Sequence, residues 1–185
     1  MTRIISGRLR GLSITVPPAG TRPTTDRVRE ALFSALQSRL DFDDLAVLDL
    51  YAGSGALGLE AVSRGAASAD LVEKASRAAS VAERNARAIG RAVPGASVRV
   101  HRASADAYLR SANGVFDLVF LDPPYDVGET ELSSTLSLLV PHLAAGATVV
   151  IERASRSAEP SLPPGLTHDR AKKYGDTTLW WALRA

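Results

Sequence analysis

The pattern of apolar and polar positions divides the chain into short strands and amphipathic helices that alternate. Apolar runs of strand length stand at residues 46–51, 69–73, 98–101, 116–121 and 148–152. Between them, apolar residues recur at three- and four-residue spacing, which predicts helices over 26–36, 75–90 and 132–143, the last ending before Gly146. Continuous apolar runs are typical of strands buried on both faces of a parallel sheet. The alternation therefore predicts an α/β domain with a mostly parallel sheet.

Both ends of the chain depart from this alternation. Residues 3–16 carry alternating apolar positions and glycines around a turn, which predicts a short β-hairpin. Residues 166–173 and 177–183 predict two strands joined tightly at 174–176, with no crossover helix between them. A plain dinucleotide-binding domain would continue with parallel units instead. We therefore expect a Rossmann-like, seven-stranded, mostly parallel sheet that ends in an antiparallel hairpin and carries an N-terminal β-hairpin extension.

Charge is distributed unevenly along the 185 residues. The first 40 residues hold seven arginines against two acids, a net charge of +5, whereas the whole chain carries only +2. An arginine-rich end on a slightly acidic body indicates a surface that faces a polyanion. We expect residues 1–20 to form an arm that contacts RNA and residues 21–185 to form the catalytic domain. The candidate RNA-binding residues are Arg3, Arg8, Arg10, Arg22 and Arg27.

Composition excludes several classes of function. The chain has no cysteine, which rules out disulfides, thiolate metal sites and enzymes that methylate pyrimidine C5 through a cysteine adduct. His101, His142 and His168 are scattered without ligand spacing, so no metal site is expected. The sequence shows no membrane-length apolar run and no signal-peptide pattern, so a soluble, cytoplasmic protein is expected.

A glycine-rich segment follows the first predicted core strand. Gly53, Gly55 and Gly58 fit G-x-G-x-x-G between a strand and a helix, where glycines let the backbone turn and approach a ligand closely. Glu73 stands at the end of the next strand, where a carboxylate can accept both hydroxyls of an adenosine ribose. The pattern fits either a dinucleotide or S-adenosylmethionine. Asp49, just ahead of the loop, favours the cationic S-adenosylmethionine.

The strand over 116–121 ends in Asp122-Pro123-Pro124-Tyr125. The prolines stiffen this exit, so that the Asp122 carboxylate and the Pro123 carbonyl face one spot beside the Tyr125 ring. Two acceptors suit an NH2 group, and the ring suits a planar base. The segment resembles the (Asp/Asn)-Pro-Pro-(Tyr/Phe) motif of methyltransferases that modify exocyclic amines of nucleobases. A strand end in which Asp122 merely caps backbone amides remains the plainer interpretation.

Taken together, these segments resemble the RsmD-type family of bacterial 16S ribosomal RNA guanine-N2 methyltransferases, within the class I S-adenosylmethionine-dependent enzymes. The resemblance rests on residues 3–12, 22–33, 49–55 and 122–125, of which the first two are the more specific. It implies methylation of guanine 966 at N2, with Asp122, Pro123 and Tyr125 catalytic. It also implies that the cofactor is bound by Asp49, Tyr51, Gly53, Gly55, Gly58, Glu73, Ser104, Ala105 and Asp122. Where relatives have Asp or Asn ahead of the alanine, this chain has Ser104, with Asp106 two residues later.

Several alternatives stay open at this point. An adenine-N6 DNA or RNA methyltransferase uses the same motif, whereas a dehydrogenase or a non-catalytic RNA-binding module would leave the motif without a role. Asp26 is either a helix cap or a site residue. Arg77, Arg84 and Arg87, with Asn85, are interpreted as a solvated helix face. The expected partner is 16S ribosomal RNA, within a small-subunit assembly particle or as naked RNA, and the enzyme is expected to be a monomer.

Overall fold

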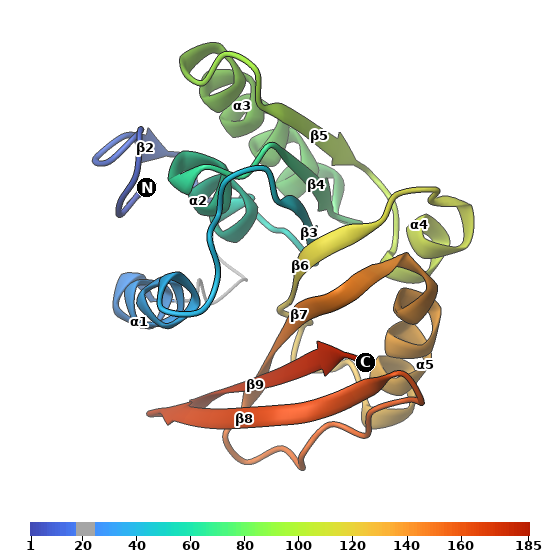
Figure 1. The fold of residues 1–185 in the computed structure, drawn as a ribbon. Coiled ribbons are helices and arrows are strands. Elements are labelled where there is room, and N and C mark those ends of the chain that lie inside the picture. The colour runs from blue at the N-terminus through green and yellow to red at the C-terminus, as the bar shows by residue number, and fades with distance from the viewer. Residues whose placement is uncertain (18–24) are drawn as a thin grey trace.

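The computed structural model describes residues 1–17 and 25–185, and it contains a seven-stranded sheet with helices on both faces (Figure 1). Its strands are β3 (Ala46–Leu50), β4 (Ser68–Val72), β5 (Ser97–His101), β6 (Phe116–Leu121), β7 (Leu143–Ala154), β8 (Leu166–Tyr174) and β9 (Thr177–Arg184). Their order is β5-β4-β3-β6-β7-β9-β8. Strands β3 to β7 pair in parallel, whereas β9 is antiparallel to both β7 and β8. The predicted fold class is therefore confirmed.

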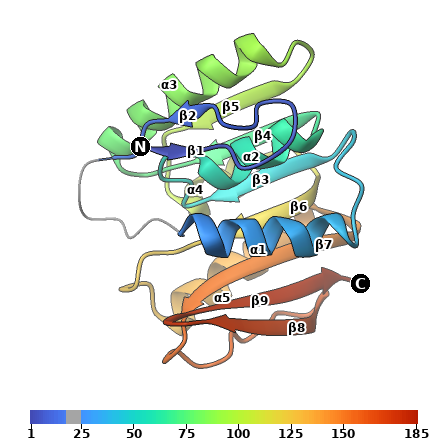
Figure 2. The same ribbon diagram turned by 90° about the vertical axis from the view of Figure 1, so that its left-hand side faces the viewer.

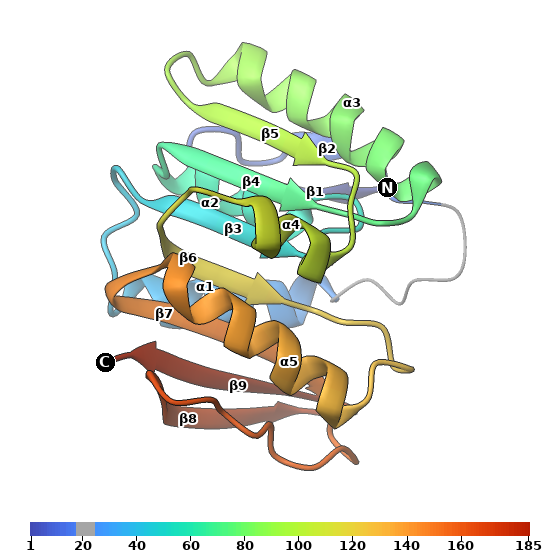
Figure 3. The same cartoon turned by 90° about the vertical axis from the view of Figure 1, so that its right-hand side faces the viewer.

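Helices cover the two faces of the sheet unequally. Helices α1 (Asp26–Gln37), α2 (Ala56–Arg64) and α3 (Ser76–Ala92) lie on one face (Figure 2), and α4 (Ala105–Ser111) and α5 (Glu129–Leu139) lie on the other (Figure 3). Alternate residues of β6 enter two separate hydrophobic clusters, Leu118 and Phe120 on one face and Val119 and Leu121 on the other. The continuous apolar run of this strand is thus explained by burial on both faces. Within the described ranges, no helix is long and apolar enough to cross a membrane.

The N-terminal hairpin packs on the domain rather than standing apart from it. Strands β1 (Thr2–Arg3) and β2 (Ser13–Ile14) pair antiparallel, and the Ile4 amide donates to the Leu12 carbonyl at 2.9 Å. Ile4 and Ile14 are each 1% exposed and belong to the same cluster as Phe33 of α1. The loop between the strands lies against α2, where a Cβ on Gly7 would stand 2.0 Å from the Ser63 carbonyl oxygen. Glycine at this position is what allows the contact.

This packing shows that the predicted N-terminal arm, residues 1–20, is not structurally independent of the domain. The boundary itself, between residues 20 and 21, lies outside the described residues. Because Ile4 and Ile14 complete the core of the domain, the segment that precedes the boundary does not have a core of its own. The RNA contact of this arm stays a prediction.

One element begins earlier than the sequence indicates. After α5, a 3₁₀ turn at Val140–His142 leads directly into β7 at Leu143, so Gly146 lies inside the strand and does not mark the end of the helix. The register between β6 and β7 shifts there, because Phe116 pairs with Leu143 but Leu118 pairs with Thr148. Gly146 has a φ of +74° within this irregular stretch. An apolar pattern interrupted by a bulge does not alternate, which is why the earlier half of the strand is missed.

Candidate functional site

A pocket of about 900 Å³ lies at the carboxyl ends of the parallel strands. Figure 3 shows β4, β5 and β6 pointing toward this edge of the sheet. In open α/β sheets, ligands bind at this edge, where connections from neighbouring strands run to opposite sides. Strand β3 is such a point, because it pairs with β4 on one side and β6 on the other. The pocket is lined by nine residues from the sequence prediction, namely Asp49, Tyr51, Gly53, Glu73, Ser104, Ala105, Asp122, Pro123 and Tyr125.

The three glycines of the loop after β3 have different tasks. Gly53, with a φ of +56°, lines the pocket. Gly55, with a φ of +82°, is the residue that precedes α2, and a Cβ there would lie 2.7 Å from Leu71 Cδ1. A Cβ on Gly58 would lie 2.4 Å from Leu71 Cδ2. Gly55 and Gly58 therefore let α2 approach β4 closely, and any effect they have on a ligand passes through the position of the helix.

Asp49 is a buried acid at the floor of the pocket. The residue is 1% exposed, and its Oδ2 accepts a hydrogen bond from the Gly58 amide at 3.0 Å. Burial raises the pKa of Asp49 to about 7, the Gly58 amide opposes this rise, and the nearby Glu73 carboxylate adds to it. A buried carboxylate in this state would be stabilised as the anion by a cation placed beside it.

Glu73 ties the glycine loop to the end of β4. Its Oε2 accepts from the Gly53 amide at 2.9 Å, and its Oε1 accepts from the Ala75 amide at 2.7 Å. Each carboxylate oxygen has a second lone pair, so both can still accept a hydroxyl of a ligand. Glu73 therefore holds the loop in shape and presents acceptors to the pocket at the same time.

The structure separates the roles of Ser104 and Asp106. Ser104 caps α4, where its hydroxyl accepts from the Ala107 amide at 3.2 Å. Asp106 accepts from the Thr135 hydroxyl of α5 at 2.6 Å. Both residues line the pocket. Ser104 and Asp106 have different hydrogen-bond partners, and both are candidates to contact an adenine ring.

Tyr51 joins the two faces of the pocket. It has a φ of +64°, an unusual value for a residue other than glycine. Burial raises the pKa of Tyr51, and the nearby Thr135 hydroxyl opposes this rise by a smaller amount. Because Thr135 donates to Asp106, it connects the surroundings of Tyr51 with α4.

The Asp122–Tyr125 segment forms the opposite wall. The loop continues in a turn in which the Val127 amide donates to the Pro124 carbonyl at 3.0 Å, and Arg153 of β7 donates to the Val127 carbonyl at 2.9 Å. Tyr125 is 60% exposed, one of few large apolar side chains at the described surface that are so open. The Tyr125 ring lies at the mouth of the pocket and is largely exposed, so its face is available to stack on a planar ligand.

Arg29 lines the pocket and was not among the residues predicted from the sequence. It is 1% exposed and donates to the Arg3 carbonyl and to the side chains of Thr2 and Asp26, the latter two both at 3.0 Å. Burial lowers the pKa of its guanidinium. The signal was present, since position 29 falls on the helix face that buries Leu32, Phe33 and Leu36. Asp26 is neither the cap, which is Thr25, nor part of the pocket lining, and it serves to hold Arg29.

Asn85 is a second residue that the sequence placed wrongly. It is 5% exposed and does not share the solvated face of the α3 arginines. Its side-chain amide accepts from the Thr15 backbone amide at 3.0 Å and donates to the carbonyls of Thr15 and Ser54, at 2.8 and 2.9 Å. Asn85 therefore fastens the hairpin to the glycine loop. The sequence signal for this role was that Asn85 is a single amide side chain in an alanine-rich helix.

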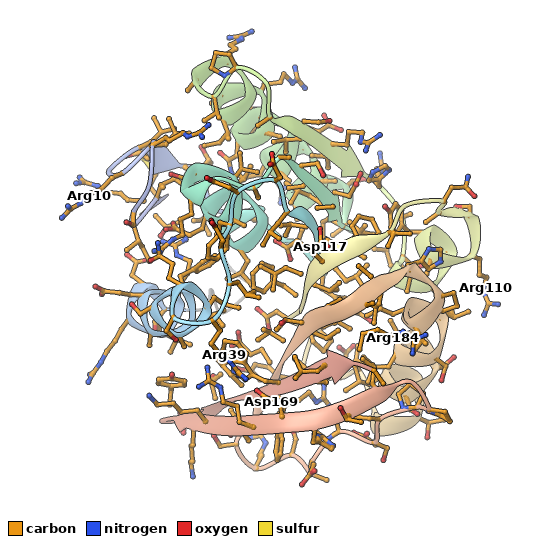
Figure 4. The ribbon with its side chains drawn as sticks, in the orientation of Figure 1. Arg10, Arg39, Arg110, Asp117, Asp169 and Arg184 are labelled. Carbon is orange, nitrogen blue, oxygen red and sulfur yellow. The ribbon has the colours of Figure 1, made fainter. Side chains whose placement is uncertain are left out.

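The predicted RNA-binding arginines lie away from the pocket lining. Arg3, Arg8, Arg10 and Arg27 are exposed, and Figure 4 shows Arg10 projecting outward from the hairpin. Arg22 lies outside the described residues. The structure thus brings nine of the predicted catalytic and cofactor residues together in the pocket lining, whereas Gly55 and Gly58 lie outside it. The four described RNA-binding candidates are exposed outside this lining.

The chain is similar to several known proteins along almost its full length. A family model described as "Conserved hypothetical protein 95" matches residues 2–182. "Ribosomal RNA small subunit methyltransferase D" of Escherichia coli (strain K12) is 37% identical over 176 residues, covering 94% of this chain and 85% of that protein. The protein of the same name from Haemophilus influenzae is 35% identical, covering 72% and 69%.

Solved structures agree with these relatives. The yhhF protein of E. coli superposes with a TM-score of 0.84 at 34% identity, covering 98% of this chain and 97% of that one. A protein of Thermus thermophilus gives a TM-score of 0.79 at 32% identity, covering 98% of both chains. A magnesium protoporphyrin IX methyltransferase from Synechocystis, with bound S-adenosylmethionine, has a TM-score of 0.68 at 16% identity, which shows a shared fold.

Proposed function

Because the chain belongs to the family of ribosomal RNA small subunit methyltransferase D (RsmD), we propose that it methylates the exocyclic N2 of a guanine in 16S ribosomal RNA. Its methyl donor is S-adenosylmethionine. The observation that carries the proposal is that one pocket unites the acids Asp49 and Glu73 with the acceptor pair Asp122 and Pro123. Guanine 966 as the target stays a prediction, as do a cytoplasmic location, a monomeric state and an assembly particle as the substrate.

The residues of the pocket fit S-adenosylmethionine. Burial raises the pKa of Asp49, and the positively charged end of this molecule would stabilise its carboxylate as the anion. Glu73 would accept the ribose hydroxyls, and Ser104 and Ala105 would lie beside the adenine. When bound, S-adenosylmethionine supplies a methyl group on a positively charged sulfur. Gly53, with a φ of +56°, would let the backbone approach the ligand closely at this point.

The opposite wall supplies the groups for the base. Guanine N2 is a weak nucleophile, because its lone pair is delocalised into the ring. The Asp122 carboxylate and the Pro123 carbonyl would accept its two hydrogens, which favours a pyramidal nitrogen with its lone pair directed at the methyl group. The Tyr125 ring would stack on a base turned out of its RNA helix or loop. Positioning and fixed charges then provide most of the acceleration.

The experiment that tests this function is a methyl-transfer assay on ribosomal RNA and small subunits from cells that lack the protein. We expect N2-methylguanosine, identified by nucleoside mass spectrometry, at a single position mapped by nuclease fragmentation. N6-methyladenosine as the product would replace the proposed target with adenine, since the Asp-Pro-Pro-Tyr motif serves both amines. Comparing naked RNA with assembled particles in the same assay identifies the substrate.

A further inference from the structure

Strand β8 carries a basic surface that the proposed chemistry does not use. It is the edge strand of the sheet, and its residues 167–173 are all exposed. This stretch contains Arg170, Lys172 and Lys173 against one acid, Asp169. Asp169 is engaged by Arg39, which lies just after the end of α1 and lowers the pKa of this carboxyl mainly through a side-chain hydrogen bond (Figure 4). Asp169 also interacts with Arg170, more weakly than with Arg39, so the one acid of this stretch is shared by two arginines and faces an excess of cations.

The side chains of β8 point alternately to the two sides of the sheet. Arg170 pairs with Trp181 and Lys172 with Leu179, and these β9 residues belong to the cluster under α1 and α2. Because paired residues share a side, Arg170 and Lys172 lie on the α1 side. Lys173 pairs with Thr178 and lies on the other side. Two lysines that are neighbours in sequence thus present equal charges to opposite sides.

The two cations on the α1 side rest on aromatic rings. The Arg170 guanidinium carbon lies 4.1 Å from the centroid of the Trp181 ring, and Lys172 Nζ lies 5.2 Å from that of Tyr174. Such contacts hold a cation in place while leaving its N–H groups available to an anion in solvent. Interleaved cations and rings are characteristic of surfaces that bind nucleic acid.

This side of the strand leads directly to the pocket. Tyr174 and the turn that follows it, Gly175 and Asp176, are part of the pocket lining, as is Thr177 at the start of β9. At about 3.3 Å per residue, Arg170 lies roughly 13 Å along the strand from Tyr174. A polyanion that delivers a base to the pocket can therefore pass over Arg170 and Lys172.

We propose that Arg170 and Lys172, on the α1 side of β8, bind the sugar–phosphate backbone of the substrate RNA next to the target nucleotide. The inference rests on the proposed function and names a surface beyond the arginines of the N-terminus. Charge complementarity supports it, because the chain outside its first 40 residues has a net negative charge and yet concentrates cations here. Phosphate contacts of this kind position a nucleic acid without reading its sequence.

A plainer account is that lysines on an edge strand prevent pairing with other sheets. That account predicts no difference between Lys172 and Lys173, since each places one charge on the same edge. The RNA account predicts a large difference. The matched single variants Lys172→Ala and Lys173→Ala separate the two accounts, and the double variant Arg170→Ala/Lys172→Ala measures the contribution of the whole surface. Arg110→Ala on α4, which Figure 4 shows at the right-hand edge of the view and on the side of the sheet opposite to α1, controls for the loss of any exposed arginine.

The measurements are RNA affinity as a function of salt, KM for RNA, kcat and S-adenosylmethionine affinity by calorimetry. For the double variant we expect an approximately tenfold rise in KM for RNA and a salt slope shallower by about 1.4–1.8. S-adenosylmethionine affinity and kcat should be unchanged, which also shows that the variant is folded. Lys173→Ala and Arg110→Ala should resemble the natural protein.

The inference is overturned if the double variant and Lys173→Ala have the same KM and the same salt slope. It is also overturned if the double variant loses activity on assembled particles but keeps its affinity for naked RNA, because the surface would then bind a ribosomal protein. Failure of the natural protein to form N2-methylguanosine would instead contradict the proposed function. The two failures are therefore distinguishable.

Discussion

The two halves of the pocket are built differently. At the ends of β3 and β4, backbone amides fix the acids in place: Asp49 is 1% exposed and bonded to Gly58, and both oxygens of Glu73 accept backbone amides. At the end of β6, by contrast, Tyr125 is 60% exposed, and residues 167–173 of the edge strand β8, which leads to this side, are all exposed. The half at β3 and β4 is largely enclosed by the protein, whereas the half at β6 presents exposed groups that a large ligand would cover.

This difference matches the sizes of the two ligands. A small cofactor gains most when its site is rigid before binding, because less conformational freedom is lost on association. A polymer brings its own rings and charges and covers exposed side chains as it docks. We therefore expect substitutions in the first half to change cofactor affinity and stability, and substitutions in the second half to change turnover and RNA affinity alone.

The largest effect should come from Asp122. Asp122→Ala removes one of the two acceptors for the amine, and we expect turnover to fall on the order of 10²- to 10³-fold, as when a positioned hydrogen-bond partner is lost at other active sites. Cofactor affinity, measured by calorimetry, should stay close to that of the natural protein. Asp122→Asn keeps one acceptor oxygen and should retain more activity than Asp122→Ala. Near-normal turnover in Asp122→Ala would show that the acceptor pair has no part in the reaction.

Asp49 should give the opposite result in the other half. Asp49→Asn keeps the shape and the bond from Gly58 but removes the charge, and cofactor affinity should fall at least about 30-fold, because losing one partner of a buried charge pair costs about 2–5 kcal/mol. Affinity of the natural protein should itself weaken below pH 7, where Asp49 with its pKa of about 7 takes up a proton. The variant should show no such dependence. Equal pH profiles would remove Asp49 from the cofactor site.

The same substitution should stabilise the protein in the absence of cofactor. The pKa of Asp49 is raised in the folded state to about 7 from its ordinary value of 3.8, so the folded state binds more protons between these values. The free energy of unfolding therefore falls as pH rises through this window. Asp49→Asn has no carboxyl to titrate, so its free energy of unfolding should not fall in this window. Above pH 7 the variant should therefore gain up to roughly 4 kcal/mol over the natural protein. Urea unfolding at pH 5 and pH 8 measures it, and a pH-independent difference between the proteins would contradict it.

Tyr125 should produce a smaller change that is confined to the substrate. Tyr125→Ala should raise KM for RNA roughly tenfold, since stacking on a base contributes about 1–3 kcal/mol. Tyr125→Phe keeps the ring and should behave like the natural protein. Because the side chain is 60% exposed, thermal stability should hardly change in either variant. A large loss of stability in Tyr125→Ala would mean that the ring is structural, and the contrast between the two halves would weaken.

The sequence predicted the parts of this arrangement that depend on local pattern. Strands buried on both faces, the glycine loop and the Asp-Pro-Pro-Tyr exit are each a short run whose chemistry can be identified without its neighbours. The sheet then brings Asp49, Glu73 and Asp122 to one edge, because the carboxyl ends of parallel strands meet there. Six of the nine predicted residues in the lining follow from these two facts, and Tyr51, Ser104 and Ala105 were expected from the family resemblance alone.

Contacts between distant segments could not be found in this way. Helical spacing places Arg29 on the buried face of α1, but the sequence does not show that its partners are Arg3 and Thr2. Asn85 was grouped with exposed arginines, although it bonds Thr15 and Ser54. The burial of Ile4 and Ile14 likewise requires the packed hairpin. Apolar periodicity assigns an element its inner face but does not say which distant segment covers it.

The smallest effect should come from the hairpin arginines, and it tests how far the open half extends over the surface. Deleting residues 1–16 would remove Ile4 and Ile14 from the core, so the substitution Arg8→Ala/Arg10→Ala is the cleaner change. Both side chains are exposed, and the Arg8 amide keeps its 2.7 Å bond to the Ser63 carbonyl. We expect RNA affinity to fall a few-fold at physiological salt, with a salt slope shallower by about 1.4–1.8 and an unchanged thermal midpoint. The buried half of the pocket should not respond, so S-adenosylmethionine affinity should equal that of Arg110→Ala and of the natural protein. An unchanged salt slope would confine the RNA-binding surface to the pocket mouth and strand β8.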